Sequence, residues 1–82
     1  MTAKPDIVWE HHRGWSTTKL LLAGRVITAE VAASMVEGQT WRVECDGQRV
    51  DGGNDYTGGF AFAYAEATIR RLVREKRLTN AT

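Results

Sequence analysis

Hydrophobic and polar residues alternate along much of the first fifty positions, which is typical of β-strands with one buried face. The strictest alternation runs from Trp41 to Cys45, where apolar and charged side chains follow one another. Asp46-Gly47 comes next, a pair that favours the type I′ turn of a two-residue hairpin. Residues 48–50 then return as the partner strand. The pattern therefore predicts a β-hairpin around this turn.

Three earlier strands are predicted from similar patterns. Residues 7–12 are β-branched and aromatic at their start, which favours an extended segment. Residues 17–23 and 26–32 flank the pair Gly24-Arg25. Glycine at the first central position suits a type II′ turn, so these two segments are expected to form a second hairpin.

The segment that follows this turn is open to two interpretations. Residues 28–37 are rich in helix formers, so a helix is the alternative to a strand. We favour a strand for residues 26–31 because the hairpin signal is the clearest local signal in the first half of the chain. A turn is then expected at residues 37–39.

Beyond the sheet the hydrophobic period changes to that of a helix. From residue 61 to residue 78, apolar residues recur every three to four positions and form one stripe, and oppositely charged side chains stand four positions apart as Glu66–Arg70 and Arg71–Glu75. The stripe consists of Phe62, Ala65, Ile69, Leu72 and Val73.

The glycine-rich segment 51–60, Asp-Gly-Gly-Asn-Asp-Tyr-Thr-Gly-Gly-Phe, raises the question of a calcium or phosphate loop. It is a single copy without the ligand spacing of an EF-hand and without the lysine of a phosphate-binding loop. We interpret it as the connection between sheet and helix, in which glycines permit positive φ and Asp55 or Thr57 caps the helix.

These elements predict one domain of the α+β class. An antiparallel sheet of three to five short strands occupies residues 7–50, and one C-terminal helix packs on a sheet face. Residues 1–6 are expected to be a flexible arm and residues 79–82 a tail.

Composition limits the function. The chain has 82 residues and a formal net charge of +1, which disfavours bulk DNA as a partner. One cysteine excludes an internal disulfide and indicates a reducing compartment, so we expect a cytoplasmic protein. No apolar run is long enough to span a bilayer.

Candidate catalytic and metal-binding residues are few. His11 and His12 would point to opposite faces of a strand, and no third ligand stands at a recognisable spacing. A pairing of His11 with Cys45 would depend entirely on the fold. We therefore expect no metal, no cofactor and no catalytic site.

Two groups of residues are candidates for binding. Trp15 follows the predicted turn Arg13-Gly14, where it is either a core residue or a contact residue; together with Arg13 and Tyr56 it is our candidate contact for a protein partner. The second group is a basic cluster near the helix end. We interpret it either as a solvated helix face or as a contact for nucleic acid. It consists of Arg70, Arg71, Arg74 and Arg77.

The layout of the second half resembles small accessory proteins of phages and mobile elements, anti-CRISPR inhibitors among them. The resemblance rests on W-R-V-E-C-D-G-Q-R-V, a glycine-rich segment, and A-Y-A-E-A-T-I-R-R-L, within residues 41–78. It implies an inhibitor or adaptor that binds one host complex, and it transfers no functional residue. We accordingly expect a non-enzymatic protein-binding module that is a monomer or a homodimer through a sheet edge, with a nucleic-acid-binding domain as the alternative.

Overall fold

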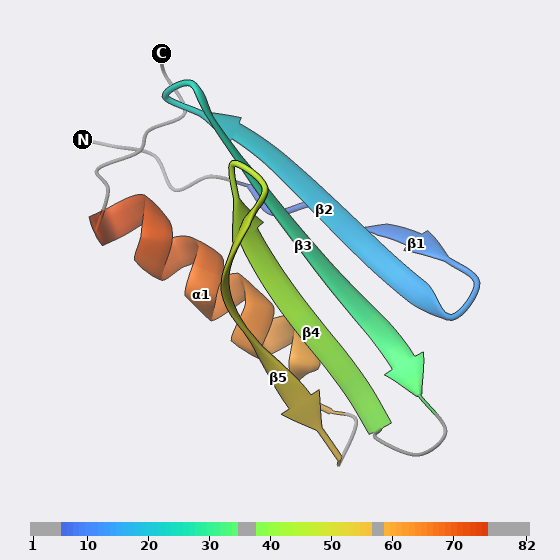
Figure 1. Ribbon diagram of the computed structural model, residues 1–82. Helices are drawn as coiled ribbons and strands as arrows, with labels where there is room; N and C mark the ends of the chain where they lie inside the picture. The colour runs from blue at the N-terminus through green and yellow to red at the C-terminus, as the bar shows by residue number, and fades with distance from the viewer. Residues whose placement is uncertain (1–5, 35–37, 57–58, 76–82) are drawn as a thin grey trace.

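The computed structural model describes residues 6–34, 38–56 and 59–75 and has the predicted α+β architecture (Figure 1). Five antiparallel strands stand side by side in chain order, and one helix packs against them. The elements are β1 (Glu10–His12), β2 (Trp15–Leu22), β3 (Arg25–Ser34), β4 (Gly38–Cys45), β5 (Gln48–Asp55) and α1 (Ala61–Glu75).

Two hairpin turns of the sheet have positive φ at both central residues, which is the type I′ pattern. At the β4–β5 turn, Asp46 and Gly47 have φ of 53° and 83°, which confirms the sequence prediction. At the β2–β3 turn, the prediction of Gly24-Arg25 in a type II′ turn is wrong by one residue. The central pair is Ala23-Gly24, with φ of 52° and 76°, because Leu22 pairs with Arg25.

The segment after this turn is a strand, which confirms the favoured interpretation. β3 is the middle strand of the sheet and pairs with β2 on one side and β4 on the other. Ile27, Ala29 and Val31 alternate onto the buried face, so burial and pairing on both edges outweigh the helix propensity of this stretch. The turn predicted at 37–39 is wrong for Gly38 and Gln39, which begin β4; residue 37 lies outside the described residues.

The glycine-rich segment is the largest correction. Residues 51–55 are not a loop but the second half of β5, with Gly52 opposite Arg42 and Gly53 opposite Trp41. A Cβ on Gly53 would lie 3.3 Å from the indole nitrogen of Trp41, so this glycine leaves room for the tryptophan ring to approach the strand.

The connection to the helix contains one of the two predicted caps. The Asp55 carboxylate accepts the backbone N–H of Phe60, and the Phe60 carbonyl accepts the N–H of Tyr64 in the first helical turn. Thr57, the other predicted cap, lies outside the described residues, as do the last three positions of the helix predicted to end at residue 78.

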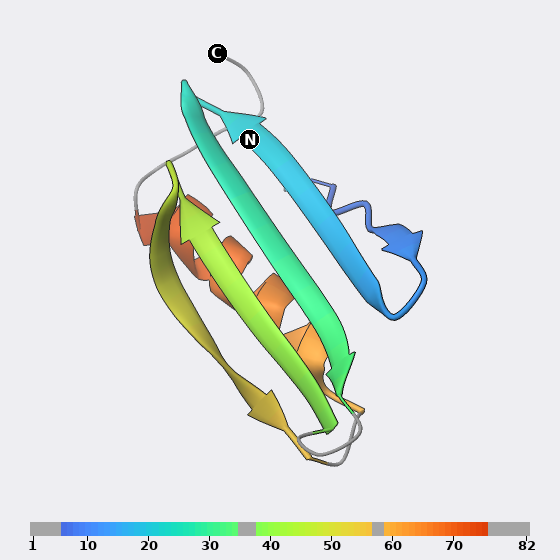
Figure 2. The ribbon, with the colours of Figure 1, turned by 45° about the vertical axis from the view of Figure 1, so that its right-hand side comes forward.

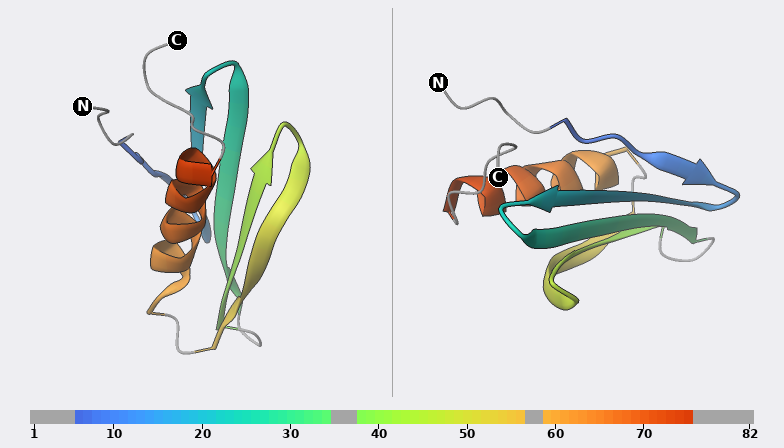
Figure 3. Two further views of the ribbon diagram at one scale, coloured as in Figure 1. Left: turned by 90° about the vertical axis from the view of Figure 1, so that its left-hand side faces the viewer. Right: turned by 90° about the horizontal axis from the view of Figure 1, so that it is seen from above.

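The core lies between α1 and the inner face of β3, β4 and β5 (Figure 3). Ala65, Ile69 and Leu72 of the helix join Ile27 and Val43 of the sheet in one buried cluster. The predicted helical stripe is therefore confirmed, with Phe62 and Val73 at its partly buried margins.

The N-terminal segment completes the cover of the inner face. Residues 7–9 were predicted to be part of a strand, but β1 starts only at Glu10. The carbonyl of Val8 accepts the Thr18 hydroxyl at 2.7 Å, and Trp9 donates its indole N–H to Glu66 at 2.8 Å. Trp9 also meets Phe62 edge to face, with ring centroids 4.9 Å apart. These contacts lay the segment against β2 and tie it to α1.

Candidate functional site

Within the described residues, the second face of the sheet has no helix or strand packed on it (Figure 2). Strand pairing places Trp15, Thr17, Lys19 and Leu21 of β2 on this face, because the intervening residues are buried on the helix side. We call this surface the open face.

The open face is hollowed. A depression of about 650 Å³ extends across the first four strands, lined among others by Glu10, Thr17, Lys19, Glu30, Arg42 and Glu44. A smaller one of about 210 Å³ adjoins it toward β5 and shares Glu30 and Arg42. The sheet therefore presents a concave surface whose lining residues are mostly polar or charged.

Trp15 stands at the β1–β2 hairpin end of the open face, which answers the question that the sequence left open: it is not a core residue. Its ring stacks on His12, with centroids 3.9 Å apart and planes 18° from parallel. Its pairing partner on β3 is Ala32, whose side chain is too small to cover an indole, so Trp15 remains 43% exposed. The stack holds the ring in one orientation without burying it.

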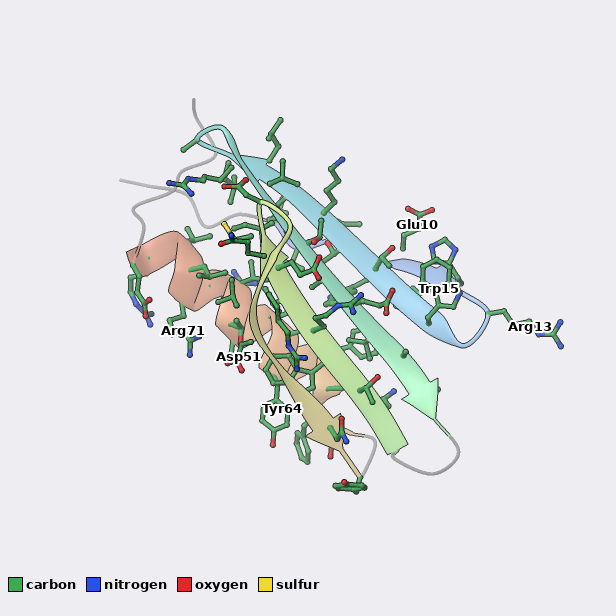
Figure 4. The ribbon with its side chains drawn as sticks, viewed as in Figure 1. Glu10, Arg13, Trp15, Asp51, Tyr64 and Arg71 are labelled. Carbon is green, nitrogen blue, oxygen red and sulfur yellow. The ribbon has the colours of Figure 1, made fainter. Side chains whose placement is uncertain are left out.

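The other two predicted contact residues lie at the same end of the molecule. Arg13 is exposed at the hairpin tip (Figure 4), and Tyr56, 73% exposed, follows the last residue of β5. β2 begins where β5 ends, three strand spacings away, so Trp15 and Tyr56 are separated by about 14 Å across the sheet.

Two further aromatic residues at this end were not predicted as contacts. Phe60 and Tyr64 are 57% and 48% exposed, with ring centroids 6.3 Å apart, and Tyr64 also leans toward Trp41 at 6.0 Å. Residues four positions apart lie on one side of a helix, and neither Phe60 nor Tyr64 belongs to the buried stripe. Their spacing in the sequence therefore could have indicated two neighbouring exposed rings. We call Trp15, Tyr56, Phe60 and Tyr64 the aromatic end.

The predicted basic cluster is divided by the fold. Arg71 faces β5 and lies 3.6 Å from Asp51 and 3.6 Å from Glu75, the second being the predicted ion pair. Arg70 and Arg74 are exposed on α1, and Arg77 lies outside the described residues. Two carboxylates thus offset the charge at the centre of the cluster.

The fold separates His11 from Cys45 and brings it to a serine instead. His11 Nδ1 lies 2.8 Å from the Ser16 hydroxyl, a distance compatible with a base and a nucleophile. Ser16 is buried on the helix side and is not among the residues that line the open-face depression. Cys45 is buried near the opposite end of the sheet, where it pairs with Ile27.

Among the described residues, no three histidine, cysteine, aspartate or glutamate side chains are grouped so that they could hold a metal ion. The helix found there is too short and too polar to cross a membrane.

Comparison with known proteins gives no relative: no family model, no curated protein and no solved structure matches this chain.

Proposed function

We propose that the protein is a non-enzymatic binding module that docks a protein partner through its aromatic end. The observation that carries this proposal is that four of the exposed large apolar side chains lie toward the same end of a small domain: Trp15 on the open face, Tyr56 after β5, and Phe60 and Tyr64 on the helix side. Aromatic residues and arginine are enriched in the energetic centres of protein interfaces, and Arg13 stands beside Trp15 at the hairpin tip. A rigid, half-exposed ring loses little entropy when a partner covers it.

Charge favours a protein over a nucleic acid as the partner of this end. Glu10 and Glu30 lie on the open face two residue pairs along the strands from Trp15, where they would repel a phosphate backbone. On the alternative surface, within the described part of α1, the charge of Arg71 is offset by Asp51 and Glu75. The capture experiment must therefore distinguish binding to a protein from binding to a nucleic acid.

The cellular role that fits this proposal is that of a cytoplasmic inhibitor or adaptor encoded by a phage or mobile element. The layout of residues 41–78 supports it by resemblance, and the buried, free Cys45 is compatible with a reducing compartment.

The test is capture of partners by the tagged protein from a bacterial lysate, with and without nuclease. Trp15→Ala and Tyr56→Ala should each lose a stoichiometric protein band that survives nuclease. Leu21→Ala is the matched control, because Leu21 is exposed on the same face at the opposite end of β2. A band retained by both aromatic variants, or one that disappears with nuclease, would contradict the proposal.

A further inference from the structure

The larger depression on the open face begins two residue pairs beyond Trp15, at the next row of side chains on the same face. Glu10 of β1 pairs with Thr17, and Thr17 pairs with Glu30 of β3, so two carboxylates flank a threonine in the row next to the tryptophan. Directly paired residues of antiparallel strands point to the same face. Glu10 and Glu30 both line the depression, and Trp15 stands beside it rather than in its lining; Figure 4 shows Glu10 and Trp15 close together.

The charges in this depression are unequally matched. Arg42 lies 3.8 Å from Glu30 and 3.5 Å from Glu44, so two carboxylates share one guanidinium. The Glu10 side chain is 79% exposed, and its ion-pair contact in the structure is His12 at 3.8 Å. Lys19, the other cation that lines the depression, stands one row farther from Trp15. The lining of the depression therefore carries three carboxylates against two cations, and Glu10 and Glu30 are the two carboxylates in the row nearest the tryptophan.

We propose that this depression receives a basic side chain, an arginine or lysine, from the protein partner that docks at the aromatic end. The inference rests on the function proposed above and adds the chemistry of the partner. The cation lies against the Trp15 ring, whose π-electrons attract it, and between the carboxylates of Glu10 and Glu30. His12 holds the ring by stacking on it, so the platform is already oriented.

A second copy of this chain is a poorer occupant of the same surface. The open face is concave, and two concave faces would touch only at their rims. An extended basic segment can enter the depression and place alternate side chains along it. Charge complementarity and shape therefore select the same class of partner.

The experiment is an NMR titration of the ¹⁵N-labelled protein with a short peptide of alternating arginine and glycine. A peptide of the same length with glutamate in place of arginine is the matched probe. The protein has three indole N–H signals, and Trp15→Phe assigns the relevant one. The arginine peptide should shift the Trp15 indole and the open-face amides, and the glutamate peptide should not.

The double variant Glu10→Gln and Glu30→Gln should weaken binding of the arginine peptide about tenfold, since each exposed ion pair contributes about threefold. Glu75→Gln is the control, because Glu75 also pairs with an arginine at 3.6 Å but lies on α1. The spectrum of each variant shows whether it is folded.

Three results would overturn the inference: no shift of the Trp15 indole, equal shifts with the glutamate peptide, or unchanged affinity in the double variant. Lysate capture separates this failure from that of the proposed function. If capture of a partner requires Trp15 but is unchanged in the double variant, the proposed binding function stands. Only the inference that a basic side chain enters the depression is then wrong.

Discussion

Asp46 shows how one residue can determine a turn and also fasten it to a neighbouring strand. Its φ of 53° lies in the left-handed region, which aspartate tolerates better than most residues. Its carboxylate accepts the backbone N–H of Val26 at 2.9 Å and meets Arg25 at 3.1 Å, while its own N–H donates to the Val26 carbonyl. The β4–β5 turn is thereby attached to the start of β3.

We expect Asp46→Ala to lower the free energy of unfolding by about 1–2 kcal/mol, through loss of the side-chain acceptor and the strain of alanine at positive φ. Asp46→Asn should cost less, because asparagine keeps one side-chain oxygen and tolerates the same φ. Urea unfolding of the three proteins at neutral pH is the measurement. Equal stability of the alanine variant and the wild type would show that the attachment contributes nothing.

At the scale of elements, local signals predicted the hairpins, and tertiary contacts decided the rest. Asp46-Gly47 was predicted correctly because its turn type follows from the two residues themselves. The turn at Ala23-Gly24 was displaced by one residue because pairing of β2 with β3 over eight positions sets the register. The second half of β5 was missed because its glycines serve the approach of Trp41, a contact that no local pattern reveals.

The candidate site divides in the same way. The sequence named Trp15, Arg13 and Tyr56 as candidate contacts and left Trp15 open between core and contact. The structure shows all three exposed, and it adds that Trp15 and Tyr56 lie toward the same end of the sheet, which no local pattern reveals. The open-face depression could not be predicted from the sequence either, because Glu10, Glu30 and Arg42 belong to three different strands and only the strand register brings them together.

The edge formed by β5 supplies a prediction at this scale. Asp51 accepts the N–H of Gly52, its own neighbour, at 2.8 Å, and its other oxygen faces Arg71. A charged residue that occupies a backbone donor at a sheet edge discourages pairing with another chain. We therefore expect the wild-type protein to be a monomer, the first of the two states left open by the sequence.

Asp51→Val should remove this protection and produce self-association that increases with protein concentration, because a β-branched residue favours an added strand. Light scattering coupled to gel filtration measures the mass of each species. Asp51→Asn is the control, since its amide oxygen can still accept the Gly52 N–H. If the valine variant remains monomeric at every concentration at which wild type does, β5 is protected by some other feature.

For the whole molecule, the division between the two faces of the sheet separates stability from binding. The inner face holds a small core in which Ile27, Val43 and Ile69 are the largest fully buried side chains. The open face holds Trp15, which is stacked on His12 and is not a member of that core cluster. A domain of this size has little stability to spare, so residues that serve the core and residues that serve a partner should respond differently to truncation.

We expect Trp15→Ala to change the free energy of unfolding by less than about 1 kcal/mol, in the range of surface substitutions. Ile69→Ala, which leaves a cavity beneath α1, should cost about 2–5 kcal/mol. The effects on partner capture should be in the reverse order. Trp15→Ala should abolish capture, whereas Ile69→Ala should reduce it only in proportion to the fraction of unfolded protein. A Trp15→Ala protein that is destabilised as strongly as Ile69→Ala would mean that the open face contributes to folding, and its aromatic end would then need no partner to account for it.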